Sequence, residues 1–305
     1  MPAQTMSLAQ WSQLILVAAV WGTSFFLIEI ALREIGPFTL VFYRLALAAV
    51  FSVLVLLVTR TRLPLDGSTW WRFFMLGAFN TAIPFSLIAS GQVYINGSLA
   101  SILNATVPVF TVVMAHYLTQ DEKMTRLRLA GVIIALVGVC ILVGPDAFAG
   151  ESSSLIGQVA VLGGAMSYAY AGIYARRFDQ IPIVQAMTGT LIAACILVCP
   201  LAFIFEYPLV TSISIATIAA IGFMAILATA LAYVIYFHVI RSAGATNTLL
   251  VVFLVPVTAI LLGVIFLNES LNARIVCAVL VVFSGLVVVD GRLVRRLLMK
   301  NSSGL

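Results

Sequence analysis

The sequence predicts an all-α integral membrane protein whose ten transmembrane helices form two inverted five-helix repeats around a central cavity. Three observations support this fold class: an apolar composition, ten apolar stretches of membrane-spanning length and an internal repeat. The chain of 305 residues is 63% hydrophobic and 9% charged, whereas a soluble domain carries about 25% charged residues. A soluble protein this apolar could not cover its own surface, so we expect the lipid bilayer to be its solvent.

Ten apolar stretches are the expected membrane-spanning helices, because crossing the hydrocarbon core takes about 20 mostly apolar residues. In the first half they cover residues 11–32, 38–58, 71–90, 98–118 and 128–143. In the second half they cover residues 155–175, 182–205, 215–238, 245–267 and 274–289. The connections between them are short and leave no room for a separate catalytic domain.

The two halves of the chain resemble each other at a spacing of about 147 residues, which indicates an internal repeat. The matched residues are Pro108 and Pro256, Glu122 and Glu269, and Gly138 and Gly285. Five helices are an odd number, so the second repeat has the opposite orientation in the membrane. We expect the repeats at residues 1–146 and 147–300, with residues 301–305 forming a polar tail of the kind that expression vectors add.

The basic residues predict the orientation. Thirteen of the 16 Lys and Arg residues lie on one side of the expected helices and two lie on the other. The thirteen are Arg60, Arg62, Arg72, Lys123, Arg126, Arg128, Arg176, Arg177, Arg241, Arg292, Arg295, Arg296 and Lys300. Because cytoplasmic loops carry the excess of basic residues, we expect a multi-pass protein of the cell inner membrane with both termini in the cytoplasm.

With these residues in order, the chain resembles the EamA-type branch of the drug/metabolite transporter superfamily over essentially its whole length. The motifs that carry the resemblance are Trp21-Gly22 in the first expected helix, Tyr43-Arg44 in the second, and Pro108 and Pro256 in the fourth and ninth. One departure is Met166-Ser167-Tyr168, where the family often has tryptophan. Within the family, the chain is most similar to the YddG-type exporters of aromatic and neutral amino acids.

This resemblance implies export of small metabolites, above all neutral and aromatic amino acids, by alternating access. Export of drugs or other metabolites by the same fold is the alternative, since a fold does not set its substrate. An intramembrane enzyme is disfavoured, because the sequence has no phosphate-binding glycine loop, zinc-protease motif or Ser/His/Asp set. We expect no cofactor, no metal and no nucleic acid. The expected partners are a small-molecule substrate and the bilayer, and a monomer is compatible with the sequence.

Polar and ring-bearing side chains inside the spans are candidates for the substrate pathway, because polar groups are costly in lipid and tend to face the bundle interior. The candidates are Trp21, Asn80, Ser101, Asn104, Gln158, Tyr168, Thr229, Tyr233 and Asn247. Each of them could instead serve an interhelical hydrogen bond. Because proline removes a backbone donor, Pro84, Pro108 and Pro256 are expected to break their helices.

Two charged residues, Glu29 and Arg44, lie inside the first two spans at similar depth. A mutual ion pair is the simplest expectation, while Glu29 as a proton site and Arg44 as an anchor for a substrate carboxylate are the alternatives. Glu29 is also the only carboxylate expected within the spans. If Arg44 keeps it ionised, transport without obligatory proton coupling follows.

The orientation gives the first test. Alkaline phosphatase fused after the last residue should be inactive and green fluorescent protein at the same place should fluoresce, because the positive-inside rule puts that end in the cytoplasm. Phosphatase that is active only in the periplasm would show that the distribution of basic residues misled us.

Overall fold

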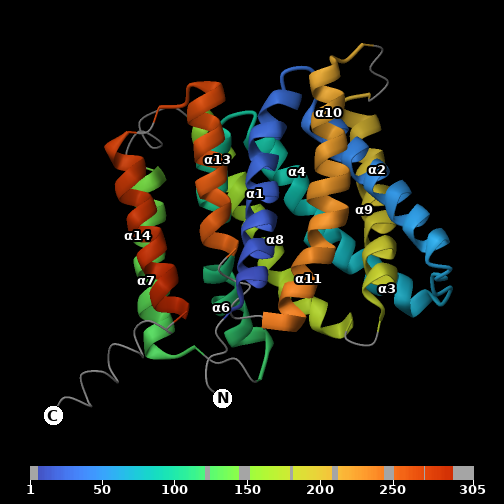
Figure 1. The fold of residues 1–305 in the computed structure, drawn as a ribbon. Coiled ribbons are helices and arrows are strands. Elements are labelled where there is room, and N and C mark those ends of the chain that lie inside the picture. Colours follow the sequence, from blue (N-terminus) through green and yellow to red (C-terminus); the bar gives the residue numbers. More distant parts are fainter. Residues whose placement is uncertain are drawn as a thin grey trace.

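The computed structural model describes residues 6–120, 124–143, 152–178, 181–207, 212–243, 251–270 and 272–290. Within these ranges the chain is helical and contains no strand. The long helices run roughly side by side as one bundle (Figure 1). The start of the first helix and the end of the last lie toward the same end of this bundle (Figure 1).

The helices follow the expected spans closely. The first half contains α1 (Leu8–Ala31), α2 (Pro37–Val58), α3 (Gly67–Gly77), the π-helix η1 (Ala78–Ala82), α4 (Ile83–Gly91), α5 (Gly97–Asn104), α6 (Val107–Leu118) and α7 (Arg126–Val143). The second half contains α8 (Ser152–Tyr174), the 3-10 helix η3 (Ala175–Phe178), α9 (Ile183–Phe205), α10 (Ile215–Phe223), the π-helix η4 (Met224–Leu231), α11 (Ala232–Ala243), α13 (Val251–Leu267) and α14 (Ala273–Asp290).

Seven segments of the described chain are long and apolar enough to cross a membrane. They are α1, α2, α3 to α4, α5 to α6, α8, α9 and α10 to α11. Two shorter apolar helices cover residues 254–267 and 273–289. Each expected span therefore lies on helix over nearly all of its described residues, with a turn at Ala105 and Thr106 inside the fourth span. Residues 245–250 of the ninth span lie outside the described part.

Polar caps set the helix starts at the ends of the bundle. Ser7 and Gln10 form a capping box at α1, and Asp66 accepts a hydrogen bond from the Thr69 N–H at α3. Asn96 and Ser214 accept from the third backbone N–H of α5 and α10. Such side chains satisfy backbone donors that a helix start leaves unpaired. Hydrogen bonds from Ser68 and Thr69 lower the pKa of Asp66.

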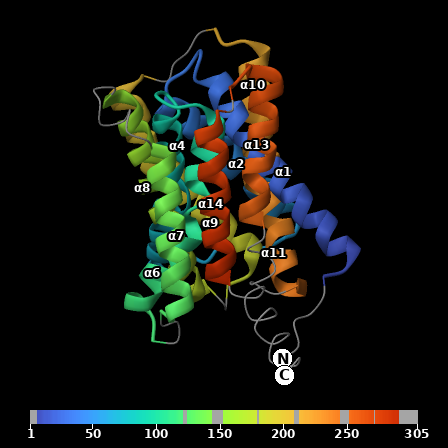
Figure 2. The ribbon, with the colours of Figure 1, turned by 90° about the vertical axis from the view of Figure 1, so that its left-hand side faces the viewer.

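The helix contacts have the symmetry of a two-fold repeat. The first span (α1) packs on the ninth (α13), and the sixth (α8) packs on the fourth (α5 and α6). The second span (α2) packs on the seventh (α9), and the fifth (α7) on the tenth (α14). If each span is exchanged for the span five places away, the contact of the first with the ninth becomes that of the sixth with the fourth. The contacts between the second and seventh and between the fifth and tenth are unchanged. Figure 1 and Figure 2 both show α7 and α14 side by side at the edge of the bundle.

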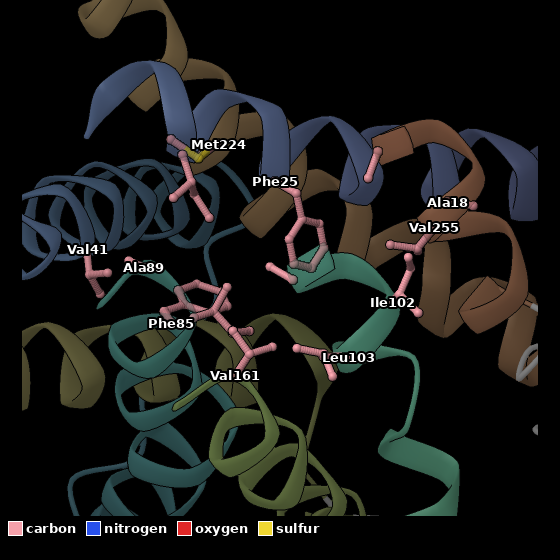
Figure 3. Packing of buried hydrophobic residues seen from close by; sticks show 14 of the residues in the cluster. Ala18, Phe25, Val41, Phe85, Ala89, Ile102, Leu103, Val161, Met224 and Val255 are labelled. Carbon is pink, nitrogen blue, oxygen red and sulfur yellow. The ribbon is translucent and has the colours of Figure 1, made fainter. Parts of the chain in front are cut away.

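One continuous apolar core joins helices of both halves. Phe25 of α1, Phe85 of α4, Val161 of α8 and Met224 of η4 are buried in the same cluster (Figure 3). Phe25 and Phe85 belong to the first half of the chain, and Val161 and Met224 belong to the second. Apolar packing therefore holds the halves together around the polar residues described below.

The prolines act differently from one another. Pro84 lies in the first turn of α4, directly after η1, and Pro108 lies in the first turn of α6, after α5 has ended. The expected break at Pro256 is wrong, because α13 continues through it. At this level α13 is held against α1: a Cβ on Gly22 would lie 2.6 Å from the Val255 oxygen. This packing supports the helix across the one hydrogen bond that proline removes.

A feature that the sequence did not predict is a π-helical stretch in the third span of each half. It covers residues 78–82 in η1 and 224–231 in η4. A π-helix bonds each N–H to a carbonyl five residues back and is frequent at functional sites. Its presence in equivalent spans marks these two spans as the irregular ones of the bundle.

Close backbone packing between α7 and α14 predicts a strong effect of one methyl group. A Cβ on Gly285 would lie 2.5 Å from the Ala135 nitrogen and 2.7 Å from the Gly131 oxygen. Gly285→Ala should therefore lower the free energy of unfolding in detergent by about 1–3 kcal/mol. The matched control is Gly172→Ala on α8, where nothing lies within 4 Å and where alanine should stabilise the helix by about 0.5–1 kcal/mol. Similar thermal shifts for the two variants would contradict close packing at Gly285.

Candidate functional site

Arg44, on the second turn of α2, is a buried charge in the middle of the bundle. Its side chain is 6% exposed. The Nε donates a hydrogen bond of 2.9 Å to Thr229 Oγ1 of η4, and the guanidinium carbon lies 3.9 Å from the ring centroid of Phe85. A cation over an aromatic face is stabilised by the ring quadrupole. Arg44 is thus held by one polar and one aromatic contact from two different spans.

The π-helix prepares Thr229 for this bond. The Thr229 hydroxyl donates at 2.8 Å to the Met224 carbonyl, five residues back. Its hydrogen is therefore used within η4, and its lone pairs face Arg44 Nε. Thr229 itself is fully buried. The irregular helix turn in this way fixes the direction of an acceptor for a buried guanidinium.

The two terminal nitrogens of Arg44 remain available. Among the described residues only its Nε has a hydrogen-bond partner. A guanidinium in this state can bind a carboxylate through two parallel hydrogen bonds.

Aromatic side chains surround the same place. Trp21 of α1 donates its indole N–H at 2.9 Å to the Ala228 carbonyl of η4. Its ring lies 5.6 Å from that of Tyr233 and 5.0 Å from that of Tyr236. Asn80 of η1 donates to the Tyr233 hydroxyl at 3.3 Å. Both π-helices therefore contribute side chains to one site.

Tyr168 of α8 completes the group, since it interacts electrostatically with Arg44 and Tyr233. We call the set the Arg44 cluster; it consists of Trp21, Arg44, Asn80, Phe85, Tyr168, Thr229, Tyr233 and Tyr236. The elements that supply these residues are α1, α2, η1, α4, α8, η4 and α11. Five of the nine candidates chosen from sequence belong to it.

The other four candidates lie elsewhere. Ser101 donates to the Ser98 carbonyl of its own helix, and Gln158 donates to Ser154 on α8 while its oxygen is buried without a partner. Asn104 ends α5 with a buried, unpartnered Oδ1. Asn247 lies outside the described residues. None of the three described side chains contacts the Arg44 cluster through a hydrogen bond.

The expected ion pair between Glu29 and Arg44 is corrected by the structure. Glu29 Oε2 accepts a hydrogen bond of 3.1 Å from the Gly97 N–H at the start of α5, whereas Arg44 is bound to Thr229. The two side chains lie on neighbouring helices at similar depth but point to different partners. Similar depth does not fix which way a side chain points around its helix, and that direction decided the pairing.

Sequence reasoning missed Phe85 as a part of the cluster. Phe85 directly follows Pro84 in the first turn of α4. Tyr236 lies one turn after Tyr233, and this helical spacing indicates from sequence that the two tyrosines share a face. The position of Phe85 depends on η1, which no local sequence pattern predicted.

Comparisons with known proteins agree with this architecture. The model of the EamA-like transporter family matches the chain twice, over residues 11–144 and 155–289. The uncharacterized transporter YoaV of Bacillus subtilis is 23% identical over 274 residues, which cover 90% of this chain and 94% of that protein. Protein PagO of Salmonella typhimurium is 25% identical, over 80% of this chain and 81% of PagO.

A protein of known crystal structure is 19% identical and superposes with a TM-score of 0.67. The likeness covers 95% of this chain and 98% of the other. At this level of identity it shows a shared fold alone.

The bond between Thr229 and Arg44 can be tested on the purified protein. Thr229→Val should lower the free energy of unfolding by about 1.5–3 kcal/mol, because it removes the partner of a buried cation, and Thr229→Ser should restore most of it. Thr188→Val is the matched control: Thr188 is equally buried but makes a neutral bond of 3.4 Å to the Ser52 carbonyl, so about 1 kcal/mol or less is expected. Equal losses in the two valine variants, measured by thermal unfolding in detergent, would count against a special role for Thr229.

Proposed function

Because the chain belongs to the EamA-like transporter family, we propose that it exports small metabolites, foremost neutral and aromatic amino acids, across the cell inner membrane. In this proposal ten helices cross the membrane as two inverted repeats, residues 1–146 and 147–300, with both termini cytoplasmic. The Arg44 cluster is the substrate site. The observation that carries the proposal is the guanidinium of Arg44, which lies against the Phe85 ring and, among the described residues, is hydrogen-bonded through its Nε alone.

A carboxylate is the group that best fits Arg44. Its Nη nitrogens form a planar pair of donors, which matches the two oxygens of a carboxylate. The site is largely shielded from water, where a charge-assisted hydrogen bond is stronger. An amino acid brings a carboxylate into this site with no net charge added.

The rings of the cluster suit an apolar or aromatic substrate side chain. Trp21, Phe85, Tyr233 and Tyr236 supply ring faces and edges, and aromatic pairs are worth about 0.5–1.5 kcal/mol beyond the area that they bury. The hydroxyls of Tyr168 and Tyr233 and the Asn80 amide offer hydrogen bonds to polar parts of the substrate. A small number of polar groups in an apolar pocket is typical of sites for small molecules.

The rival substrate class is a drug-like cation. A site for such a cation would place a carboxylate against it, yet the Arg44 cluster contains a cation and, among the described residues, no carboxylate. Cationic drugs would meet repulsion from Arg44. The charge of the cluster therefore favours an anionic or zwitterionic substrate.

Alternating access is supported by the way in which the site is divided. Trp21, Arg44, Asn80 and Phe85 come from the first half, and Tyr168, Thr229, Tyr233 and Tyr236 come from the second. A site between two inverted repeats can open to either side when one half rocks against the other. The contacts between Arg44 and Thr229 and between Trp21 and Ala228 join the halves at this centre.

The test is exchange of radiolabelled L-phenylalanine in proteoliposomes preloaded with unlabelled phenylalanine. Arg44→Gln should weaken apparent affinity by about 10–100-fold, since a hydrogen bond to a charged group contributes about 1.5–3 kcal/mol. The matched control is Arg33→Gln, which removes an exposed arginine after α1 and should leave exchange unchanged.

Competition by analogues separates the carboxylate from the ring. Phenylalaninamide and phenethylamine lack the carboxylate and should compete poorly with phenylalanine in the wild type. Strong competition by phenethylamine, or full activity of Arg44→Gln, would rule out Arg44 as the carboxylate anchor. Absence of exchange for all amino acids would refute the proposed substrate class.

A further inference from the structure

Glu29 and Glu269 come together near the end of the bundle that holds the connection after α1. Glu29 lies in the last turns of α1, and its Oε2 accepts from the Gly97 N–H at the start of α5. Glu269 follows α13, where its own N–H donates to the Gly263 carbonyl at 3.1 Å. Asn268 just before it has a φ of 56°, so the chain turns sharply. This turn directs the Glu269 side chain back over α13.

Gly263 makes room for the Glu269 carboxylate. A Cβ on Gly263 would lie 2.6 Å from Glu269 Cδ and 2.7 Å from each of its carboxylate oxygens. The carboxylate therefore lies directly on the backbone of α13. Both oxygens are buried, and neither makes a hydrogen bond of ordinary length to the described residues.

Two side chains face Glu269 closely enough to interact with it, Glu29 and Ser98. Glu29 belongs to α1 and Ser98 to α5, both in the first half, while Glu269 belongs to the second. The pair therefore spans the two halves. An isolated carboxylate buried without partners is very costly, and two neighbouring carboxylates seldom both ionise.

Polar atoms beside the pair are also unpartnered. Ser98 is 4% exposed and its Oγ has no partner, and Gln92 is 6% exposed with neither amide atom bonded. Gln92 Oε1 would lie 3.5 Å from a Cβ on Gly97, the residue whose N–H binds Glu29. Native structures leave few such groups unpaired. A protonated carboxyl beside them would supply a hydrogen-bond donor.

The charges around the pair do not replace a proton. Arg33 and Glu34 follow α1 and are exposed, Tyr94 of the connection before α5 is 49% exposed, and Arg274 of α14 is not among the groups that shift the pKa of Glu269. The described parts of α5, α8 and α13 contribute no charged side chain. Burial raises the pKa of Glu269, hydrogen bonding with Ser98 offsets part of the rise, and the charge of Glu29 adds to it. No cationic residue lowers it.

We propose that Glu29 and Glu269 form a proton-binding site that takes up one proton from the outer solution and holds the outer ends of the two halves together. With the proton bound, the protonated carboxyl donates a hydrogen bond to the other carboxylate. The Gly97 N–H donates a second hydrogen bond to Glu29. When the proton returns to water, two negative charges face each other and push α1 and α5 away from the turn after α13. The use of this opening in transport rests on the proposed function; the proton site itself does not.

One premise for transport without proton coupling therefore fails, because Glu29 is not paired with Arg44. Glu29 remains the only carboxylate within the expected spans, but Glu269 of the connection after α13 interacts with it. Sequence order placed Glu269 in a connection between helices. The turn at Asn268 and the space at Gly263 put its side chain on the bundle.

Infrared titration of the purified protein without substrate tests the site. The C=O stretching band of a protonated carboxyl should be present at mildly acidic pH and disappear as the pH rises. Glu29→Gln and Glu269→Gln should each remove it or shift its midpoint down by about one pH unit or more, since the shared proton belongs to both residues. The matched control is Glu34→Gln: Glu34 lies on the same end, bonded to the Ser214 N–H, with no acidic neighbour in that contact. It should leave the band unchanged.

A second measurement needs no variant at the site. A carboxyl whose pKa is raised on folding stabilises the folded state below that pKa and loses this contribution as the pH rises through it. The melting temperature of the wild type and of Glu34→Gln should therefore fall with rising pH across the range where the band disappears. A band that both site variants retain with an unchanged midpoint, or a melting temperature that is independent of pH in this range, would overturn the proposal.

Sodium distinguishes a proton site from a metal-cation site. At fixed pH and ionic strength, replacing choline by sodium should leave the carboxyl band in place. Loss of the band in sodium alone would overturn the proton assignment in favour of a sodium site. These measurements use no substrate, so a titrating pair in a protein that exchanges no amino acid would refute the proposed substrate while leaving the proton site standing.

Discussion

The hydrogen bond from Arg44 to Thr229 is the interaction on which the centre of the structure depends. A guanidinium removed from water needs partners for its donors and its charge. The protein supplies one acceptor from η4, the face of Phe85 from α4, and polar hydroxyls nearby. These partners come from spans far apart in sequence, so satisfying one charge fixes the positions of several helices.

The same requirement explains the irregular third spans. In a regular α-helix a threonine hydroxyl reaches the carbonyl four residues back, as Thr23 does with Ala19 in α1. In η4 the wider turn lets the Thr229 hydroxyl bond to the Met224 carbonyl and lets the Ala228 carbonyl accept from Trp21. Asn80 enters the site from the corresponding π-helix of the first half. Backbone irregularity at membrane depth is tolerated where it lines a polar interior, and here it builds that interior.

Carboxylates and helix starts join the halves at the end of the bundle where Glu29 lies. Glu206, which ends α9, accepts from the N–H groups of Phe38 and Thr39 at the start of α2. Glu34, after α1, accepts from the Ser214 N–H at the start of α10, and these bonds lower the pKa of Glu34. Helix starts attract negative charge because their N–H groups are unpaired and the helix dipole is positive there. Each of these three bonds connects one half of the chain to the other, so this end is held by acid-to-amide contacts as well as by apolar packing.

The family and its helical, two-repeat organisation could be inferred from the sequence, because length and hydropathy restrict what a chain can do in a bilayer. Ten apolar stretches predict helices at nearly the observed places, since a helix is the structure that satisfies its own backbone there. Helix starts at Asp66 and Asn96 also follow local rules. The aromatic and polar candidates Trp21, Asn80, Tyr168, Thr229 and Tyr233 were recognisable because such groups avoid lipid.

Tertiary structure alone decided which of these groups meet. Arg44 turned to Thr229 and Phe85, and Glu29 turned to Gly97 and Glu269, because the rotation of a helix about its axis depends on packing against its neighbours. The π-helices and the continuity of α13 through Pro256 likewise depend on contacts between helices. Sequence specifies which residues are costly to leave in lipid, and the packed bundle determines the partner that each one finds.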